Sequence, residues 1–290
     1  MQDIIVIVGP TGVGKTKLSI ELAKKIDAEI INGDSVSIYK CLNIGSAKPS
    51  KEEMDGVVHH LIDIKNIDEE YSIFDYQKDV RNLISDITSR NKRIIIVGGS
   101  GLYLKSALYD YNLTEGTTYN EYSDLTNEEI YQKINELNSN IDVHVNNRKR
   151  LVRILNKLEN NEEIGDCKDK LLYPVKFIGL TTDREILYER INLRVDNMIE
   201  NGLLNEINSL KDKYNNSRVL NTAIGYKEFY DYLYNNKSLD IVIDSIKQNS
   251  RRYAKRQYTF FNHQMDVKWF MVNFNNFDYT ISGVEEYIKK

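Results

Sequence analysis

A glycine-rich motif near the amino terminus is the segment of this sequence with the plainest chemistry. Its letters, GPTGVGKT, fit the pattern GxxxxGK[ST] completely and directly follow a short β-branched run. In this pattern the glycines let a loop close around an anion, while main-chain N–H groups and the start of the next helix supply positive potential. Lys15 can then reach terminal phosphate oxygens, and the hydroxyl of Thr16 can ligate Mg²⁺. The motif therefore predicts a diphosphate- or polyphosphate-binding loop rather than a chance glycine-rich turn. The predicted loop consists of Gly9, Pro10, Thr11, Gly12, Val13, Gly14, Lys15 and Thr16.

The acid that usually accompanies such a loop is missing from its usual place. Enzymes that hydrolyse nucleoside triphosphates normally carry an Asp at the end of a second buried strand, where it holds the metal. Here the apolar run at 94–97 continues into GGSG instead. The acidic candidate is Asp34, which follows the run at 29–32 and could hold a metal or act as a base. A plain loop-capping role for Asp34 is the alternative.

Arginines suited to phosphate lie in the segment DREILYERINLRVDNMI, residues 183–199. Arg binds phosphate through two parallel hydrogen bonds. The helical period places Arg190 and Arg194 on one face, four residues apart, and an apolar face inward. The residues expected to face inward are Leu187, Ile191, Val195 and Met198. Solvent-facing ion pairs with Glu185 and Glu189 are the alternative, most of all for Arg194.

Basic charge is concentrated in two short stretches of an otherwise acidic chain. The formal net charge is −4, which taken alone argues against a partner rich in phosphate. Residues 144–157 and 247–257 nevertheless carry five Lys or Arg each and no acid. Helical phase places an apolar face opposite the basic one in each stretch. The residues expected to point outward are Lys149, Arg153, Lys157, Arg251 and Lys255. This distribution is typical of a surface that follows a phosphate backbone, and two ordinary solvated helix faces are the alternative.

Alternating strands and helices must position these residues. Buried β-branched runs predict strands at 4–8, 29–32, 94–97 and 175–181, and helical spacing predicts helices at 15–26 and around 76–90. Strands that alternate with helices in this way form a parallel sheet covered by helices, so the expected fold class is α/β.

The strand–helix alternation stops after residue 109. Thr126 and Glu129 form a capping box that predicts a helix at 127–137, and a second helix is expected at 148–158. We therefore expect an inserted helical subdomain that contacts the polymeric partner, and then three or four helices over 183–262. The expected division of the chain is 1–110 for the first part of the core, 111–170 for the insert, and 171–290 for completion of the core.

Composition excludes several classes of protein. The chain has 290 residues, 41% of them hydrophobic and 28% charged, as in globular proteins with a large core. Cys41 and Cys167 cannot make a disulfide framework and have no zinc-like spacing, which favours a reducing compartment. The amino terminus lacks the charge pattern of a signal peptide, and no apolar run approaches ~18 residues. We expect a cytoplasmic monomer with no membrane partner.

Beyond the motif, GDSVSIYKCLNIGSAKP at 33–49 resembles the DSMQVYxxLDIGTAKP segment of tRNA dimethylallyltransferases, also called tRNA isopentenyltransferases. The resemblance continues in order to residue 262 through further blocks. These blocks lie at 57–63, 71–79, 94–108, 146–155, 183–203, 223–228 and 250–261. The chain departs from the family pattern at Val36-Ser37 and at Lys149, where the family has Met-Gln and Gln. Ser100 replaces a Thr and keeps its hydroxyl.

The resemblance implies a fold, a reaction and a set of site residues. The fold would be a P-loop NTPase-like parallel sheet flanked by helices, with the inserted subdomain. The reaction would transfer a dimethylallyl group from dimethylallyl diphosphate to N6 of the adenosine adjacent to the anticodon (position 37) of tRNA, with Mg²⁺ as cofactor. Asp34 would be the general base, assisted by Lys15 and Thr16, and Arg184 and Arg190 would join the loop in binding diphosphate. Contacts to the tRNA anticodon stem-loop would come from Asp34, Ser35, Val36, Ser37, Ser100, Lys149, Arg150, Arg153, Arg251 and Lys255.

Three rival functions remain open on the sequence. The chain could prenylate free adenine nucleotides, although a nucleotide needs no basic insert. It could be a P-loop kinase for a small metabolite, which would not explain the missing strand-end Asp. It could also be a nucleic-acid-binding protein in which the P-loop serves only as a switch.

Overall fold

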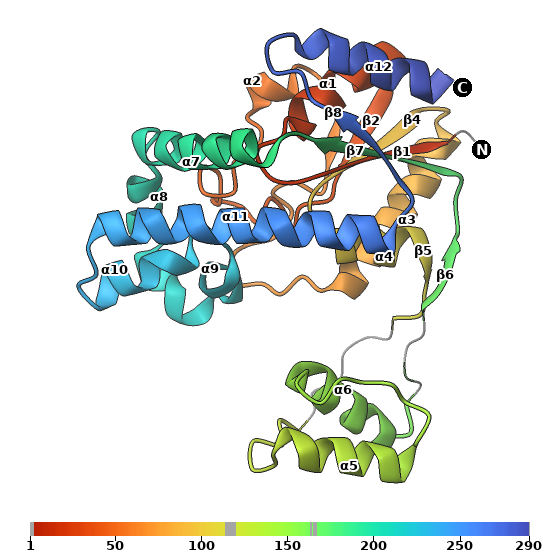
Figure 1. The fold of residues 1–290 in the computed structure, drawn as a ribbon, viewed down its shortest axis with the longest axis vertical. Coiled ribbons are helices and arrows are strands. Elements are labelled where there is room, and N and C mark those ends of the chain that lie inside the picture. Colours follow the sequence, from red (N-terminus) through yellow and green to blue (C-terminus); the bar gives the residue numbers. More distant parts are fainter. Residues whose placement is uncertain (1–2, 114–119, 163, 165–166, 290) are drawn as a thin grey trace. The chain divides into compact units, whose positions relative to one another are not determined.

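The computed structural model describes residues 3–113, 120–162, 164 and 167–289. The chain forms two compact units (Figure 1). The first contains residues 1–109 and 171–290, and the second contains residues 110–170. Parts of the predicted insert, at 114–119, 163 and 165–166, lie outside the described residues.

A six-stranded parallel sheet is the centre of the first unit, which confirms the α/β prediction. Its order is β3-β2-β4-β1-β7-β8. The strands are β1 (Ile4–Val8), β2 (Ala28–Asn32), β3 (His59–His60), β4 (Arg93–Val97), β7 (Val175–Thr181) and β8 (Val267–Met271). The four strands expected from the sequence are present within a residue of their predicted bounds. The two edge strands, β3 and β8, were not predicted.

Strand β1 shows why its sequence is an uninterrupted apolar run. Its residues alternate between two cores on opposite faces of the sheet. Ile4, Val6 and Val8 join one core, and Ile5 and Ile7 join the other. A parallel strand buried on both faces needs apolar side chains at every position.

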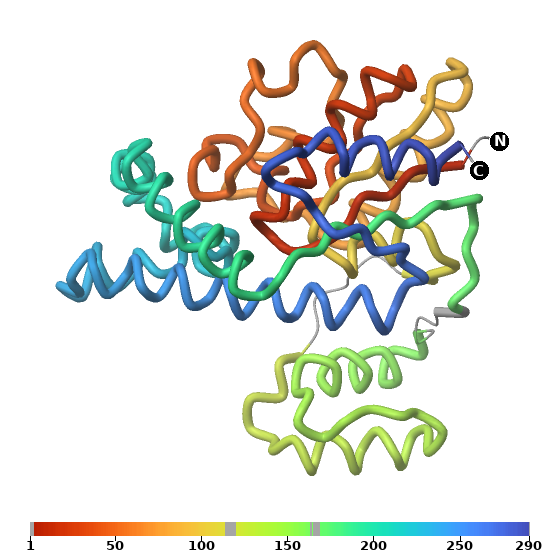
Figure 2. The backbone as a smooth tube through the Cα atoms, turned by 45° about the horizontal axis from the view of Figure 1, so that its top comes forward, coloured from red at the N-terminus to blue at the C-terminus, as the bar shows by residue number. Residues whose placement is uncertain are grey.

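Helices cover both faces of this sheet. α1 (Lys15–Ile26) and α12 (Phe277–Lys289) pack together on one face (Figure 1; Figure 2). The opposite face is covered by α3 (Ile73–Ser89), α4 (Gly101–Leu108) and α11 (Leu239–Gln264). α7 (Arg184–Glu200) gives side chains to both cores.

The stretch after β7 contains more helices than the three or four expected. Besides α7 and α11 it holds α8 (Leu203–Ser209), α9 (Arg218–Thr222) and α10 (Tyr230–Tyr234). Two 3₁₀ turns, at Lys211–Asn216 and Lys227–Phe229, separate them. The connections between these helices are short and polar, so hydrophobic periodicity in the sequence did not reveal where each helix ends. A one-turn helix, α2 (Lys51–Met54), precedes β3.

The second unit is built around two helices, α5 (Asn127–Leu137) and α6 (Arg148–Glu159). Thr126 and Glu129 form the predicted capping box at the start of α5. The core of this unit is small and apolar, and its fully or nearly buried members are Ile130, Ile134, Val143, Leu151, Ile154 and Leu155. The sequence predicted only helices in this insert, but β5 (Tyr109–Tyr111) pairs with β6 (Cys167–Leu171) where the chain enters and leaves the unit. In the part of the chain that the structure describes, no helix is long and apolar enough to span a lipid bilayer.

Candidate active site

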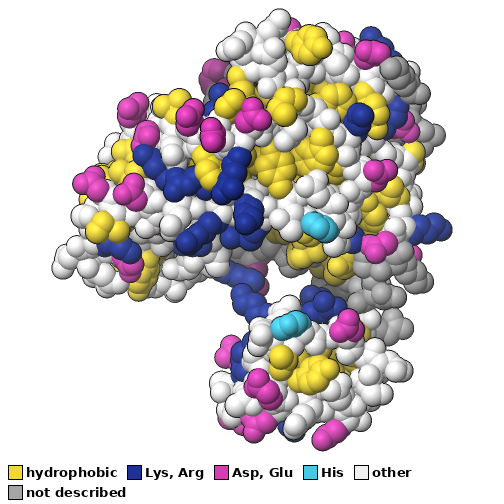
Figure 3. Space-filling view, viewed as in Figure 1, with side chains coloured by type: hydrophobic (Ala, Val, Ile, Leu, Met, Phe, Trp, Pro, Cys, Tyr) yellow, Lys and Arg dark blue, Asp and Glu magenta, His cyan; other side chains and the backbone are white. Residues whose placement is uncertain are grey.

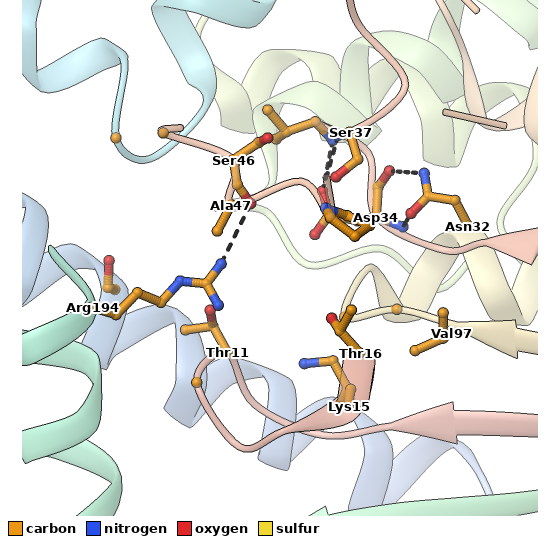
Figure 4. Close-up of a pocket in the computed structure, with 18 of the residues that line it drawn as sticks. Thr11, Lys15, Thr16, Asn32, Asp34, Ser37, Ser46, Ala47, Val97 and Arg194 are labelled. Atoms are coloured by element: carbon orange, nitrogen blue, oxygen red, sulfur yellow. Dashed lines mark hydrogen bonds between the residues drawn. The ribbon is translucent and has the colours of Figure 1, made fainter. Parts of the chain in front are cut away.

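A cavity of about 990 Å³ opens at the carboxyl ends of β1, β2 and β4 (Figure 4). Its walls come from the glycine-rich loop, the segments that follow β2 and β4, helix α7, the turn before Lys227, and helix α11. Open α/β sheets bind ligands at this edge, where loops from several strands converge. The cavity therefore gathers residues from the whole length of the first unit.

The glycine-rich loop forms one wall. Gly9, Gly12 and Gly14 have positive φ angles of 138°, 81° and 101°, which side chains rarely adopt. A Cβ on Gly9 would lie 2.6 Å from the carbonyl oxygen of Leu180. Of the eight predicted loop residues, the cavity is lined by Thr11, Gly12, Gly14, Lys15 and Thr16. The other three loop residues, Gly9, Pro10 and Val13, are buried and do not line the cavity.

Lys15 folds back over the loop that carries it. Its Nζ donates to the carbonyl oxygens of Gly9 at 2.9 Å and Pro10 at 2.7 Å. The pKa of Lys15 is lowered to about 7, first by burial and then by the positive charge of Arg194, while the negative charge of Asp34 acts in the opposite direction. The charged ammonium is thus poorly compensated here, and an anion in the cavity would stabilise it.

Asp34 occupies the wall formed by the segment after β2. Asn32 brackets it, because Asn32 Oδ1 accepts from the Asp34 main-chain N at 3.0 Å and Asn32 Nδ2 donates to the Asp34 carbonyl oxygen at 2.9 Å. Asp34 Oδ1 accepts from the main-chain N of Val36 at 2.8 Å and of Ser37 at 3.4 Å (Figure 4). Oδ2 has no hydrogen-bond partner among the described residues. One oxygen therefore caps the turn, and the other is open to a ligand.

Four residues near Asp34 were predicted to contact RNA, and three of them line the cavity. Ser35, Val36 and Ser37 line the cavity, although Ser37 is only 5% exposed. Ser100 is not among the lining residues, and its hydroxyl accepts from the Ser35 main-chain N at 3.1 Å. Ser100 thus ties the segment after β4 to the segment after β2.

Helix α7 brings two arginines to the cavity, but not the pair expected. Arg190 Nε donates to the Gly12 carbonyl oxygen at 3.1 Å, and its guanidinium lies 3.9 Å from the ring centre of Phe274. Arg194 points into the cavity, and its Nη2 donates to the Ser46 carbonyl oxygen at 3.4 Å (Figure 4). Burial lowers the pKa of the Arg194 guanidinium.

Arg184, predicted to bind diphosphate, lies elsewhere. It is exposed, does not line the cavity, and sits over the ring of Tyr188 at 5.1 Å. Because it stands ten residues before Arg194 at the start of α7, the helix carries it away from the glycine-rich loop. Arg194, for which solvent-facing ion pairs were weighed most heavily, is the arginine that faces Lys15 and Asp34.

Gln257 on α11 is a site residue that the sequence analysis missed. Its Oε1 accepts from the Thr11 main-chain N at 3.0 Å, and its Nε2 donates to the Gly99 carbonyl oxygen at 3.1 Å. A Cβ on Gly99 would lie 2.0 Å from Nε2, so a side chain there would displace the Gln257 amide. Tyr253, one turn earlier, donates its hydroxyl to the same Gly99 oxygen at 3.3 Å. These two side chains join the glycine-rich loop to the segment after β4.

Helix α6 presents fewer outward charges than its helical phase predicted. Lys149, Arg150 and Arg153 are exposed. Lys157, expected on the same face, is only 4% exposed, and that prediction was wrong. Arg148 is also turned inward, where it donates to the carbonyl oxygens of Tyr122 at 2.6 Å and Leu125 at 2.9 Å. Helical phase alone does not take account of the segment before α5, whose carbonyl oxygens accept from Arg148.

Helix α11 shows a similar difference. Arg251, predicted to point outward, is half-buried, and its Nη1 donates to Asn192 Oδ1 on α7 at 2.5 Å. Lys247 makes an ion pair with Asp196 of α7 at 2.6 Å. The exposed basic residues of this stretch are Arg252, Lys255 and Arg256. Figure 3 shows Lys and Arg side chains gathered over α7 and α11.

A magnesium ion would find one protein ligand and open space here. Thr16 lines the cavity, and no partner for its hydroxyl is found in the described part of the chain. No group of three or more His, Cys, Asp or Glu among the described residues could hold a metal by itself. Mg²⁺ commonly binds through one or two protein oxygens together with phosphate oxygens and water. The residues therefore fit an ion that arrives with a diphosphate.

Comparisons with known proteins point to one family. Residues 37–264 match the family model described as IPP transferase. A tRNA dimethylallyltransferase of Bacillus cereus is 46% identical over 286 residues, which cover 93% of this chain and 90% of that protein. One of Bacillus anthracis is also 46% identical, with 93% and 91% covered.

Solved structures of similar proteins agree with the sequence comparisons. The full-length tRNA isopentenylpyrophosphate transferase of Bacillus halodurans superimposes with a TM-score of 0.78 at 38% identity, covering 100% of this chain and 96% of that one. A eukaryotic dimethylallyltransferase acting on tRNA superimposes with a TM-score of 0.83 at 29% identity, covering 98% and 78%.

Proposed function

The chain belongs to the IPP transferase family of tRNA dimethylallyltransferases, and on that premise we propose how its cavity performs the reaction. The reaction transfers a dimethylallyl group from dimethylallyl diphosphate to N6 of the adenosine adjacent to the anticodon, position 37, of tRNA. The observation that carries the proposal is one cavity lined on one side by a phosphate-binding loop and on the other by Asp34.

The glycine-rich loop holds the diphosphate as a leaving group. When the allylic C–O bond breaks, its electron pair stays on the diphosphate oxygen, where negative charge grows. Main-chain N–H groups of the loop, Lys15 and Arg194 lie where they can stabilise that charge, and Arg190 extends the clamp beside Gly12. Carbon is transferred, and the P–O–P linkage is left intact.

Asp34 serves the nucleophile. The exocyclic N6 of adenine is weakly nucleophilic because its lone pair is delocalised into the ring, but the allylic carbon can carry much positive charge in the transition state. N6 forms a bond to that carbon and must lose one proton. We assign this proton to Asp34 Oδ2, since Oδ1 is held by main-chain N–H groups.

The hydroxyl of Thr16 is the protein ligand for Mg²⁺ in this proposal. When bound, the ion neutralises charge on the diphosphate. Thr16 lies in the first turn of α1, so an anion bound at the helix N-terminus would lie close to the Thr16 hydroxyl.

The acceptor in this proposal is the anticodon stem-loop of tRNA. Its unpaired bases can leave the stack, so the target adenine can enter the cavity beside Asp34. Exposed Lys149, Arg150 and Arg153 on one unit, and Lys255 on the other, provide phosphate contacts. We propose that the protein acts as a cytoplasmic monomer.

Mass spectrometry of the acceptor tests the proposed function. Incubation with dimethylallyl diphosphate, Mg²⁺ and unmodified tRNA should add one C5H8 unit to the adenosine next to the anticodon. AMP should be a poor acceptor, and ATP should keep its γ-phosphate. Transfer to AMP alone, phosphoryl transfer from ATP, or nucleotide-gated RNA binding without a covalent product would each favour one of the rival functions.

Replacement of Asp34 tests its assigned role. Asp34→Ala should lower the single-turnover rate of diphosphate release by about 10²–10⁴-fold, the usual scale for loss of a general base. Asp34→Asn keeps the shape of the turn and should be impaired to a similar extent. Wild-type rates in both variants would show that Asp34 only caps its loop.

A further inference from the structure

Four successive main-chain N–H groups converge on one carboxylate and the tyrosine hydroxyl bonded to it, both outside the cavity lining. They belong to residues 43–46, the loop that ends at the cavity wall. Glu206 Oε2 accepts from Asn43 at 3.0 Å and from Ile44 at 2.9 Å. Glu206 Oε1 accepts from Gly45 at 3.2 Å and from the Tyr226 hydroxyl at 2.7 Å. The fourth N–H, that of Ser46, donates to the same hydroxyl at 3.2 Å.

The contact between this loop and its support is close. Tyr226 is fully buried, and a Cβ on Gly45 would lie 2.7 Å from its ring. A Cβ on Gly225 would lie 3.0 Å from the Gly45 carbonyl oxygen, and Gly225 has a positive φ of 92°. Both glycines are therefore required for the loop to reach Glu206 and Tyr226.

The other side of the loop faces the cavity. Gly45, Ser46 and Ala47 line it, and the Ser46 carbonyl oxygen accepts from Arg194 Nη2 at 3.4 Å. Glu206 and Tyr226 do not line the cavity. A continuous chain of contacts thus runs from Glu206 through the loop to the arginine that faces Lys15.

We propose that Glu206 and Tyr226 form a latch on residues 43–46 that orients Arg194 toward the diphosphate. Glu206 is a positioning residue in this scheme, because it acts through the Ser46 carbonyl and touches no substrate. The inference rests on the proposed function, since it names what aligns the diphosphate clamp of the same site.

The chemistry explains why a carboxylate suits this position. Glu206 accepts four hydrogen bonds on two oxygens, and hydrogen bonds to an ionised group are stronger than neutral ones. A glutamine of the same shape has one acceptor oxygen. With its NH₂ on the Oε1 side, the Tyr226 hydroxyl can turn to accept from it, but the Gly45 N–H has no acceptor. Glu206→Gln must therefore lose the charge and at least one of the four bonds, and the loop loses its alignment.

Kinetics of Glu206→Gln test the latch. The KM for dimethylallyl diphosphate and the Kd for inorganic pyrophosphate with Mg²⁺ should each rise about tenfold, the effect of losing one charge-assisted bond, while kcat falls less. Glu69→Gln is the matched control. Glu69 also accepts a main-chain N–H, from Asn66 at 2.7 Å, but it lies on the surface of the same unit and outside the cavity lining. Its KM and Kd should stay at wild-type values.

A double-mutant cycle separates positioning from general loosening of the fold. If Glu206 acts through Arg194, Glu206→Gln should add little to the effect of Arg194→Lys on the Kd for pyrophosphate. Additive effects, or a Kd for Glu206→Gln within twofold of wild type, would overturn the latch. Should Glu206→Gln fail to fold, Tyr226→Phe keeps the ring, removes the shared hydroxyl and should shift the Kd in the same direction; an unchanged Kd there overturns the proposal. A wild-type protein that binds pyrophosphate but leaves tRNA unmodified would refute the proposed function and not the latch.

Discussion

At the scale of single residues, the cavity is a place where charges lack their usual compensation. Lys15 has a pKa lowered to about 7, first by burial and then by Arg194, and Arg194 itself is held in a buried setting. Asp34 is the acidic residue nearest to balancing them, and one of its oxygens already caps a turn. Such a site is electrostatically unfavourable when empty, so we expect an anion bound there to stabilise it.

Glu29 shows the opposite arrangement and carries a prediction about pH. This buried carboxylate accepts from both Nη atoms of Arg90 and from His60 Nε2 at 2.7 Å. The hydrogen bonds from Arg90, above all, lower the pKa of Glu29 from 4.5 to about 2. Because the pKa is lower in the folded protein than in the unfolded chain, this carboxylate stabilises the fold fully above about pH 4.5. Its contribution is lost as pH falls toward 2.

Glu29→Gln should therefore lower the free energy of unfolding by about 1 kcal/mol at pH 7, after allowance for solvent screening at the exposed Arg90. The difference from wild type should vanish as the pH is lowered through 4 to 2. Urea denaturation at several pH values measures this. Glu70→Gln removes an exposed ion pair with Arg218 and should leave the free energy of unfolding within about 0.5 kcal/mol of the wild-type value. A pH-independent difference for Glu29→Gln would contradict the assignment.

Residues whose position in the cavity depends on local sequence could be predicted, and those whose position depends on distant packing could not. The positions of Lys15 and Thr16 could be predicted from the eight consecutive residues of the motif, because the conformation of the loop depends mainly on its own sequence. Gln257 lies 246 residues from Thr11, and no spacing rule links them. The helical period correctly placed Arg190 and Arg194 on one face, but only the packing of α7 shows which arginine reaches the cavity.

At the scale of elements, α11 does more than its amphipathic pattern suggested. Its 26 residues contact the glycine-rich loop through Gln257, the segment after β4 through Tyr253, and α7 through Lys247 and Arg251. On its apolar face Val242 and Ile246 are buried, whereas Tyr253 and Phe260 are only partly buried. A helix that touches several walls of a cavity sets their spacing.

Edge elements escaped prediction for a physical reason. β8 is only partly buried, so its sequence lacks the continuous apolar run that marks the central strands. α4 begins at Gly101, inside the glycine-rich segment after β4, and glycine is a poor helix former. In both cases tertiary packing, rather than local preference, stabilises the element.

Helix α6 gives a prediction about salt. Replacing its three exposed cations in Lys149→Ala, Arg150→Ala and Arg153→Ala together should weaken tRNA binding and reduce the slope of log K against log salt by about 2–3. Each phosphate contact contributes roughly one released counterion to that slope. Binding titrations from low to moderate salt measure it.

Lys133→Ala is the matched control for this helix. Lys133 is an exposed cation on α5 of the same unit, outside the basic stretch, and its removal should leave the slope unchanged. An equal loss of slope in the control would mean that the unit binds tRNA by diffuse charge. An unchanged slope in the triple variant would mean that α6 does not contact phosphate.

At the scale of the whole molecule, stability is divided between separate cores. The two cores that sandwich the sheet both belong to the first unit, and the six buried residues of the third core all belong to the second. A unit of about 60 residues buries a smaller fraction of its surface than one of more than 200. The second unit should therefore be the less stable of the two.

This division predicts that denaturation is not a single transition. Trp269, the only tryptophan in the chain, lies in β8 and packs on Tyr258 with ring centres 5.3 Å apart, so its fluorescence reports on the first unit. Far-UV circular dichroism reports on helices of both units. In urea, the dichroism change should begin before the fluorescence change, because α5 and α6 unfold first.

Two perturbations should then separate the transitions. Pyrophosphate with Mg²⁺, at about 100 times its Kd, should stabilise the fluorescence transition by about 2.7 kcal/mol and leave the early dichroism phase where it was. Ile134→Ala, which removes a fully buried side chain from the third core, should move only the early phase, by about 2–5 kcal/mol. The fluorescence and dichroism changes could instead coincide in wild type, with Ile134→Ala shifting both together. The two units would then unfold as one cooperative body, and diphosphate bound in the first unit would also stabilise the helices of the second against urea.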